Sequence, residues 1–388
     1  SIPINGSAIF QNDLNIKNIF SRVTGGSLSN IDGLIKTQGN ANLFLINPSG
    51  IIFGQNSRLE INGSFFATTA DSVIFNNGFE FSATNIQTPS LLTVDIPIGL
   101  RFRDNSKSIT NQSIGLNQDG SLGLRVPSGN TLALIGGDVN LDTGGLLAQG
   151  GRVELGGLAT AGTVRINNDG SLSFAANITK SNVSLTNSSV IAVAAGGGGH
   201  VGINARNLEI SGGSVIVGGI FPGQGMMGAQ AGDIIINVTD KFTITDSSLI
   251  NNFVGSSSIG NAGDIVINTG VLEGIGSFRI GSGTLGRGDA GKVSITAKES
   301  FSLQGLQGLG SGITSAVAPS AVGNADEIII STRDFSLSNG AQLATSTLGQ
   351  GSAGNIKVNA SNSISINSGS ILQAATGGLG NAGKIIID

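Results

Sequence analysis

The sequence predicts an all-β protein built as a parallel β-helix with three strands in each coil. The first observation is a phrase, Ala-Gly followed by a polar residue and an Ile/Val run, that recurs through the second half of the chain with two diverged copies. Its polar positions lie at intervals of 33, 31, 28, 35, 28 and 29 residues. A period in this range indicates stacked supersecondary units, each too small to bury an apolar face alone. The aligned positions are His200, Asp233, Asp264, Lys292, Glu327, Asn355 and Lys384.

The second observation is that each late repeat contains three short stretches in which apolar and polar residues alternate, which is the period of a β-strand. In the repeat that starts at Asp233 these stretches are 234–238, 242–244 and 248–250, and in the repeat that starts at Lys292 they are 293–295, 301–303 and 313–317. Coils of this kind stack about 4.7–4.9 Å apart. We therefore expect the aligned polar positions to form one column up the side of the stack. A propeller fits less well, because its blades run to about 40–50 residues and usually carry aromatic signatures, whereas this chain has no Trp and no Tyr.

Composition indicates a folded chain with little surface charge. Glycine supplies 62 of 388 residues, hydrophobic residues 39% and charged residues 11%, a balance that excludes disorder and favours frequent tight turns. The net charge of -4 with scattered Lys and Arg argues against nucleic acid as a partner, because phosphate binding requires clustered cations. Without cysteine there is no disulfide and no thiolate site. No apolar run approaches the roughly 18–20 residues that span a bilayer.

The first part of the chain differs from the rest in composition and in the regularity of its repeats. Ten of the 17 Phe residues lie between Phe10 and Phe102, and the echoes of the repeat phrase at 136–139, 150–153 and 161–164 are less alike. We therefore predict two parts, residues 1–160 and residues 161–388, with the regular repeats in the second. Because the chain starts at Ser1 without Met or a signal region, we expect it to be a processed or excised segment.

Motifs in the first part carry a resemblance to a known family. They are Ser21 to Gly26, Asn30 to Gly33, Gly63 to Ala70, Gly136 to Val139 and, most specific, Asn47-Pro48-Ser49-Gly50-Ile51. Residues 5–160 thereby resemble the amino-terminal secretion domain of filamentous-haemagglutinin-like exoproteins, the secreted partners of two-partner secretion systems, in its cyanobacterial form. The family's Asn-Pro-Asn-Gly-Ile motif has Ser49 in place of its second Asn. Its Asn-Pro-Asn-Leu motif is matched only faintly, by Asn12, Asp13 and Leu14.

This resemblance implies a right-handed β-helix and a non-enzymatic exoprotein of a Gram-negative bacterium, secreted to the medium or the cell surface. It implies an outer-membrane transporter with polypeptide-binding domains as the partner, and adhesion or aggregation through a surface glycan or protein as the role. We predict no cofactor, no metal and no catalytic residue. The family has further residues ahead of the point where this chain starts, so residues 1–160 are expected to lack the cap of that domain.

The segment from Asn47 to Gly50 also has a purely physical interpretation. Pro48 fixes φ and Gly50 permits a positive φ, so the segment suits a type I or type II turn between strands at 43–46 and 51–53. Two roles stay open for it. The turn either holds one coil in register or contacts the transporter directly, and the two roles are compatible.

Several other short motifs are assigned to turns. Gly286 to Lys292 and Gly378 to Lys384 match part of a phosphate-binding loop, but neither has Ser or Thr after the Lys and neither opens a predicted helix. Arg287-Gly288-Asp289 spells an integrin-type tripeptide in a predicted turn. His200 is the only histidine, so a multi-histidine zinc site is excluded.

Within the column, two neighbouring pairs of charges are expected to interact. Asp233 over Asp264 either shares a cation with carbonyl oxygens or, as we favour, remains as two solvated carboxylates. Lys292 beside Glu327 forms an exposed ion pair, which contributes about 0–1 kcal/mol.

Two further functions stay open. Parallel β-helices also host polysaccharide lyases and hydrolases, whose chemistry needs converging carboxylates that the sparse charges of this chain do not indicate. The other is a structural fibre that grows by end-to-end self-association, because uncovered strand edges at the ends of a coil stack pair readily.

Overall fold

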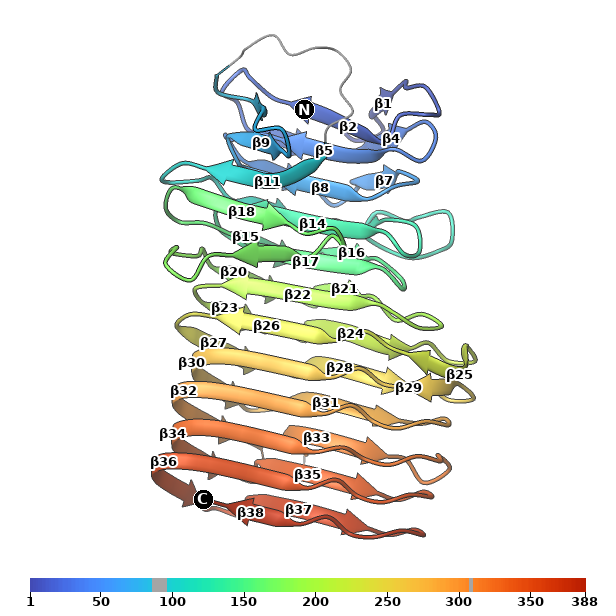
Figure 1. Ribbon diagram of the computed structural model, residues 1–388, viewed down its shortest axis with the longest axis vertical. Helices are drawn as coiled ribbons and strands as arrows, with labels where there is room; N and C mark the ends of the chain where they lie inside the picture. The colour runs from blue at the N-terminus through green and yellow to red at the C-terminus, as the bar shows by residue number, and fades with distance from the viewer. Residues whose placement is uncertain (86–95, 307–309) are drawn as a thin grey trace. The chain divides into compact units, whose positions relative to one another are not determined.

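The structure is a computed structural model that describes residues 1–85, 96–306 and 310–388. Every regular element in these ranges is a β-strand (Figure 1), which confirms the all-β prediction. A search of the same ranges gave no helix able to span a membrane. The chain divides into two compact units, and β20 (Val183–Thr186) and β22 (His200–Ala205) contribute residues to both. Unit 1 comprises residues 1–148, 152–184 and 202–206, and unit 2 comprises residues 149–151, 185–201 and 207–388.

In unit 1 the chain coils so that equivalent strands of successive coils pair in parallel, giving three sheets. The first contains β1 (Ser7–Phe10), β4 (Leu34–Thr37) and β7 (Arg58–Glu60). The second contains β2 (Asn18–Arg22), β5 (Asn42–Ile46), β8 (Phe65–Thr68), β14 (Thr131–Gly136) and β17 (Arg152–Gly157). The third contains β3 (Ser29–Ile31), β6 (Ile51–Phe53), β12 (Ile109–Asn111) and β15 (Val139–Asp142). A parallel pair, β13 (Leu124–Arg125) and β16 (Gly145–Leu147), completes the coils.

An antiparallel sheet packs on the outer face of the second sheet of unit 1. Its strands, in spatial order, are β10 (Glu80–Ser82), β9 (Ser72–Phe75), β11 (Pro97–Phe102), β18 (Gly162–Ile166) and β19 (Leu172–Phe174). One apolar cluster joins Phe44 and Phe66 of the coils to Phe75 and Phe102 of this sheet. On the coil side the rings of Phe20, Phe44 and Phe66 stack with centroids 4.8 and 4.5 Å apart. This second apolar layer, which the sequence analysis did not predict, is the physical reason for the many Phe residues before residue 103.

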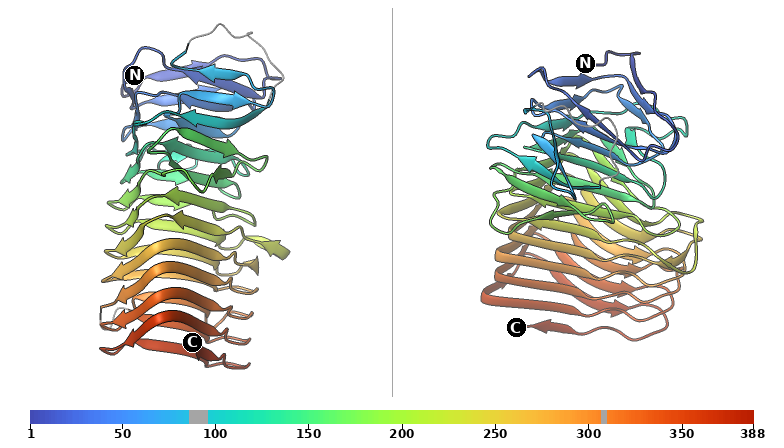
Figure 2. Two further views of the ribbon diagram at one scale, coloured as in Figure 1. Left: turned by 60° about the vertical axis from the view of Figure 1, so that its left-hand side comes forward. Right: turned by 45° about the horizontal axis from the view of Figure 1, so that its top comes forward.

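Unit 2 is a regular parallel stack (yellow to red in Figure 2). One sheet contains β21 (Val190–Ala192), β24 (Val215–Ile220), β28 (Ser248–Val254), β31 (Phe278–Thr284), β33 (Gly312–Val317), β35 (Gln342–Thr347) and β37 (Ile371–Thr376). The other contains β23 (Leu208–Ile210), β26 (Ile234–Val238), β27 (Lys241–Thr245), β30 (Ile265–Ile275), β32 (Val293–Gln304), β34 (Ile328–Ser338), β36 (Ile356–Ile366) and β38 (Ile385–Ile387). A short ribbon pairs β25 (Gly225–Gln230) with β29 (Ile259–Asn261).

Alternating apolar residues build the core of unit 2 as ladders, as the period of two requires. Phe242, Leu272, Phe301 and Phe335 follow one another in register through successive coils, and all are fully buried. The rings of Phe301 and Phe335 are parallel, with centroids 5.3 Å apart. Stacking in register therefore produces the parallel β-helix that the repeats predict.

The later coils differ from the expected pattern at one corner. The stretches at 293–295 and 301–303, predicted as separate strands, run on into one another as β32, with a register shift between Ala297 and Ser300. β34 pairs with β36 through a similar shift. A β-bulge bends a strand without ending it. Each coil thus keeps three sides, and the turn expected at this corner is replaced by a bulge.

The repeat phrase occupies another corner, where two coils approach closely. Ala262 and Ala290 are buried. A Cβ atom added to Gly263 would collide with the carbonyl oxygen of Gly232, and one on Gly291 with that of Gly263. The phrase therefore places a small buried residue and then a residue without a side chain against the coil before it.

Candidate functional site

The segment from Asn47 to Gly50 forms a hydrogen-bonded β-turn between β5 and β6. The N–H of Gly50 donates to the carbonyl oxygen of Asn47 at 3.1 Å. Ser49 is not among the residues with positive φ, which excludes a type II turn and fits type I. Of the two turn types that the sequence allows, the structure contains type I.

The Asn47 side chain ties this turn to the preceding coil. It is fully buried, and its Nδ2 donates to the carbonyl oxygen of Ser27 at 2.9 Å and to Oγ of Ser29 at 2.8 Å. Its Oδ1 accepts from the N–H of Ser49 at 2.9 Å. A buried amide with these partners is a structural group, because leaving any of the partners unpaired would cost free energy.

Gly50 and Ile51 join the turn to the sheet that follows. Gly50 has a φ of 106°, and a Cβ atom there would lie 2.8 Å from Cδ1 of Leu28, so a side chain is both strained and crowded. Ile51 is fully buried in β6, which pairs with β3 on one side and β12 on the other. Only Pro48 and Ser49 of the five residues keep partly exposed side chains.

The weak second motif, Asn12-Asp13-Leu14, lies at a different corner. Oδ1 of Asn12 accepts from the N–H of Gln38 at 3.1 Å, and Oδ1 of Asp13 accepts from the N–H of Asn15 at 3.0 Å. Leu14 is 75% exposed. These residues precede β2, whereas Asn47 follows β5, and β2 and β5 pair in parallel along their whole lengths. The two motifs therefore lie at opposite ends of the same sheet, and the structure does not bring them together.

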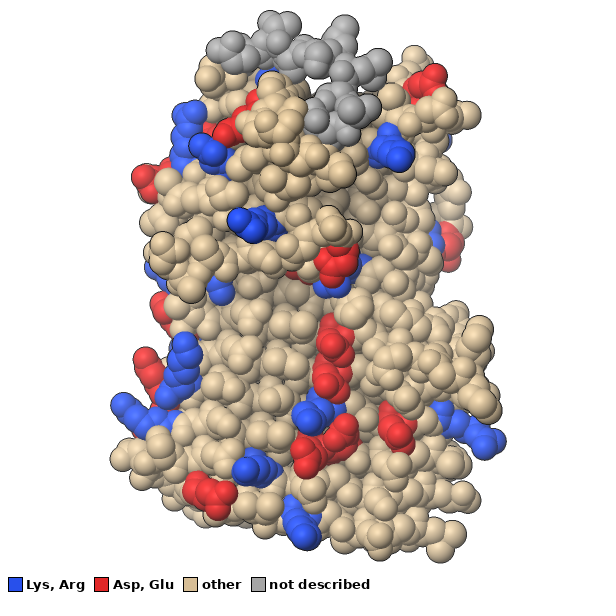
Figure 3. All heavy atoms as spheres, viewed as in Figure 1, with Lys and Arg blue, Asp and Glu red and all other residues tan. Residues whose placement is uncertain are grey.

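The predicted column is confirmed, and its members are joined by hydrogen bonds. Side-chain acceptors on His200, Asp233, Asp264 and Asn355 each receive a hydrogen bond from the N–H of the next member, at 3.2, 2.9, 2.9 and 2.9 Å. Lys292 and Glu327 form an ion pair of 3.9 Å, and Nδ2 of Asn355 donates to Oε1 of Glu327 at 3.1 Å. Figure 3 shows charged side chains of both signs lying one above another on this face.

A second ladder runs three residues ahead of the first, on the other side of the Ala-Gly pair. Side-chain oxygens of Asn261, Asp289, Asn324 and Ser352 accept from the N–H one coil further on, at 3.0, 2.7, 2.9 and 3.2 Å. Asp289 of the Arg-Gly-Asp tripeptide is thus a structural acceptor. The polar residues on both sides of the Ala-Gly pair therefore accept hydrogen bonds from backbone N–H groups of the next coil.

Within the column, the pKa of Asp264 is shifted from its ordinary value. Burial raises the pKa of Asp264, and the carboxylate of Asp233 acts in the same direction, while the hydrogen bond from the Lys292 N–H opposes it. Each of the two carboxylates uses one oxygen to accept from a backbone amide. Within residues 1–85, 96–306 and 310–388 no three His, Asp or Glu side chains gather in a group able to hold a metal.

One buried carboxyl in unit 1 escaped the sequence analysis. Glu154 of β17 is 2% exposed and lies 3.1 Å from Nη1 of Arg152, whose Nη2 contacts Asp169 at 3.0 Å. Burial raises the pKa of Glu154 to about 7, although the Arg152 guanidinium lowers it. Glu154 pairs in register with Ala133 of the apolar cluster. Glu154 therefore faces the same apolar layer as Ala133, at a position where an apolar residue would be expected.

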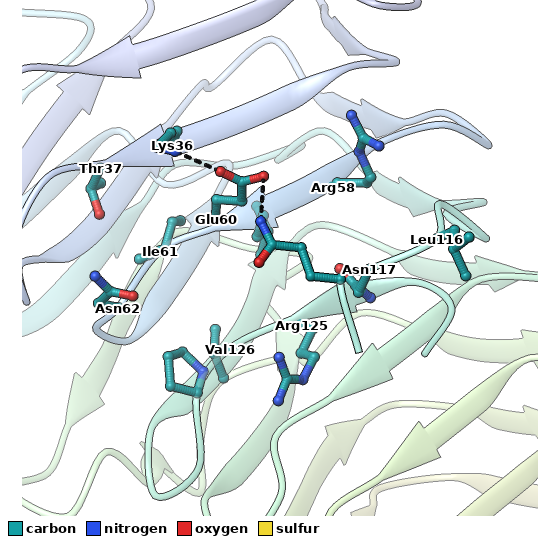
Figure 4. A pocket seen from close by; sticks show the side chains of 13 residues that line it. Lys36, Thr37, Arg58, Glu60, Ile61, Asn62, Leu116, Asn117, Arg125 and Val126 are labelled. Atoms are coloured by element: carbon teal, nitrogen blue, oxygen red, sulfur yellow. Dashed lines mark hydrogen bonds and ion pairs between the residues drawn. The ribbon is translucent and has the colours of Figure 1, made fainter. Parts of the chain in front are cut away.

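Unit 1 also has a polar hollow of about 340 Å³ beside β4 and β7. Lys36, Arg58, Glu60 and Arg125 are among its lining residues (Figure 4), and Gln118 also lines it. Glu60 is held by Nζ of Lys36 at 2.8 Å and by Nε2 of Gln118 at 3.5 Å. The hollow is lined by side chains of both charges. It could not be predicted from the sequence, because Glu60 and Gln118, which contact each other across it, lie 58 residues apart.

The chain resembles known proteins both in sequence and in fold. The family model described as TPS secretion domain matches residues 1–195. Among solved structures, the HMW1 secretion domain from Haemophilus influenzae is similar, with a TM-score of 0.55 over 99% of this chain and 93% of that chain. The two are 15% identical in sequence, so this likeness concerns the fold alone. A search of curated proteins gave no match.

Proposed function

The chain belongs to the family of TPS secretion domains, and on that premise we propose that it acts as a non-enzymatic adhesin. It is a two-partner-secreted exoprotein, and a partner transporter carries it across the outer membrane of a Gram-negative cell. Adhesion or aggregation through a surface glycan or protein is the role that we assign to it. The family match over residues 1–195 is the observation that carries this proposal, and the cyanobacterial origin stays a prediction.

Within this function the turn from Asn47 to Ile51 is proposed as the secretion motif. The buried hydrogen bonds of Asn47 support a role in holding the register of the first coils. Pro48 and Ser49 are the only residues of the motif that are partly exposed, which supports them as the residues for the proposed contact with the transporter. The separation of Asn12, Asp13 and Leu14 from this turn supports a separate and minor role for the second motif.

The adhesive role draws support from the surface of unit 2. Its corners display amides, hydroxyls and carboxylates that are already bonded to the next coil, so they are held in fixed positions. A surface whose side chains are ordered before binding loses less entropy on contact than a mobile one. A repeated polar edge of this kind suits a repetitive partner such as a surface polysaccharide.

Secretion tests the export half of the proposal. The full chain, carrying a signal peptide, is expressed in a Gram-negative host with and without a two-partner transporter from the source organism, and the protein in the medium is measured. We expect export only with the transporter. A chain that reaches the medium equally well without the transporter would refute the proposal.

Two variants separate the two roles of the turn. Pro48→Ala/Ser49→Ala leaves the hydrogen bonds of Asn47 in place. If it folds normally but stays in the periplasm, the turn contacts the transporter. If it is exported normally while Asn47→Ala is not, the turn acts through coil register alone.

Adhesion is tested on purified protein. Beads coated with the chain are mixed with cells of the source organism and with cells stripped of surface polysaccharide by periodate. We expect binding to the former and a loss of at least tenfold on the latter for a glycan partner. Beads that bind neither cell type better than albumin-coated beads would exclude the adhesive role, while turnover of a solubilised polysaccharide would favour an enzyme instead.

A further inference from the structure

All of the sulfur in this chain lies at one place. The chain has two methionines and no cysteine, and the methionines are neighbours, Met226 and Met227, in β25. Their exposed fractions are 71% and 92%. Methionine is normally a core residue. The only two methionines of this chain are instead exposed to solvent, which makes this position unusual.

The backbone around the pair leaves the sheet. β25 pairs with β29 at Gly225 and again at Gln230, with the register shift falling between these two positions. Gly228 has a φ of 81° and open space around the position of a Cβ atom. The β25–β29 ribbon is labelled at the edge of the stack in Figure 1, and Figure 2 shows the same olive segment projecting from its neighbours. Residues 226–229 therefore lie between the two positions at which β25 is in register with β29.

The segment that carries the pair has no charged side chain of its own. We call residues 220–232 the methionine tip; they include no Asp, Glu, Lys or Arg, and Phe221 adds a side chain that is 48% exposed. The buried core of the described coils, by contrast, is made of Ile, Leu, Val, Phe and Ala. Reagents that attack sulfur can thus reach the tip and find no target in the core.

Exposed thioethers react with peroxides by a two-electron step. A sulfur lone pair attacks one peroxide oxygen, the S–O bond forms as the O–O bond breaks, and the second oxygen leaves as water after proton transfer. The sulfur is oxidised to the sulfoxide and the peroxide is reduced. This reaction turns a flexible apolar side chain into a polar one.

We propose that Met226 and Met227 are an oxidation site for hydrogen peroxide that switches the methionine tip from apolar to polar while the coils stay folded. The proposal stands apart from the secretion function and holds wherever the chain meets an oxidant. Any contact that the tip makes through its apolar surface is then released by oxidation.

The test is a peroxide titration of the full chain followed by peptide mass spectrometry. We expect two added oxygen atoms per chain, one on each methionine, at rates within about threefold of those for free methionine, since reactivity follows exposure. The melting temperature, followed by circular dichroism, should move by less than about 2 °C. Retention on a hydrophobic-interaction column should fall.

The matched control is Met226→Leu/Met227→Leu, which keeps the apolar tip and removes the sulfur. It should take up no oxygen and keep its retention through the same titration. Oxidation at less than about a tenth of the free-methionine rate would overturn the proposal. So would unfolding in step with oxidation, or unchanged retention of the fully oxidised chain.

Discussion

Oδ1 of Asp233 accepts a 2.9 Å hydrogen bond from the backbone N–H of Asp264, its equivalent one coil later. Oδ1 of Asp264 does the same for Lys292. Sequence repeats of this kind are usually explained by apolar packing alone. Here the polar side chain of the phrase accepts a hydrogen bond from the backbone of the next coil, and this bond helps to fix the register between the two coils.

Replacing Asp264 should separate its acceptor role from its charge. Asp264→Ala leaves the Lys292 N–H without its partner and should cost about 1 kcal/mol of unfolding free energy. Asp264→Asn keeps an acceptor and removes the repulsion with Asp233 that contributes to the raised pKa, so it should match or exceed the wild type at pH 7. Urea unfolding followed by circular dichroism measures both. Equal stabilities for the two variants would contradict the capping role.

Asn47 should be the most sensitive residue of its turn. Asn47→Ala leaves groups of Ser27, Ser29 and Ser49 without a partner in a buried place, and we expect a loss of about 2–4 kcal/mol. Ser49→Ala is the matched control, because only the backbone of Ser49 takes part in the turn, and its cost should stay below about 0.5 kcal/mol. Comparison of urea midpoints tests the contrast, and a similar loss in both variants would refute it.

Glu154 should make stability fall as pH rises. Its folded-state pKa, about 7, exceeds the ordinary glutamate value of 4.5. Between these pH values the folded chain binds one more proton than the unfolded chain, so each unit by which the pH rises favours unfolding. The full effect is about 3 kcal/mol, present below pH 4.5 and lost by pH 7. Melting temperatures at pH 5 and pH 8 measure it.

Glu154→Gln is the control for that pH dependence. It remains neutral throughout and offers Arg152 an oxygen, so it should equal the wild type at pH 5 and exceed it at pH 8. A wild type and variant with parallel pH profiles would show that the carboxyl is ionised in the folded protein throughout this range.

Phe44 should hold the antiparallel sheet of unit 1 on the coils. Its ring lies between those of Phe20 and Phe66, and Phe44→Ala should cost about 3–5 kcal/mol. We expect faster hydrogen exchange in β9 and β11, with the strands of unit 2 unchanged, because stability is local in such folds. Phe221→Ala, at a half-exposed position, should leave exchange unaltered. Uniformly faster exchange in both units would contradict this local role.

Much of the coil architecture was accessible from the sequence because it repeats. The period of the phrase predicted the length of each coil, and the alternation around Ile234 and Phe242 predicted which side chains face the core. The aligned polar positions predicted the column. Asn47 was singled out by the family motif, and its turn was predicted from local chemistry, because Pro48 fixes φ and Gly50 permits a positive φ. These features depend on neighbours in the chain or on a constant spacing.

The remaining features depend on contacts between segments with no constant spacing. The antiparallel sheet joins β11 to β18, some 60 residues on, and only the unbroken apolar run Leu43-Phe44-Leu45-Ile46 hinted that both faces of β5 are covered. The burial of Glu154 follows from that same cover. The bulge within β32 was hidden because its polar residues resemble those of a turn.

The glycine of the repeat phrase also limits how this protein can change its length. Each such glycine sits against the carbonyl group of its predecessor, so inserting one residue ahead of it would drive a side chain into the main chain of the coil before it. A whole coil can be added or removed without disturbing this contact, because each copy brings its own glycine except the diverged one, which has Asp326 at this position. Genetic lengthening of this array is therefore expected to proceed in steps of one repeat, with single-residue variation confined to the other corners.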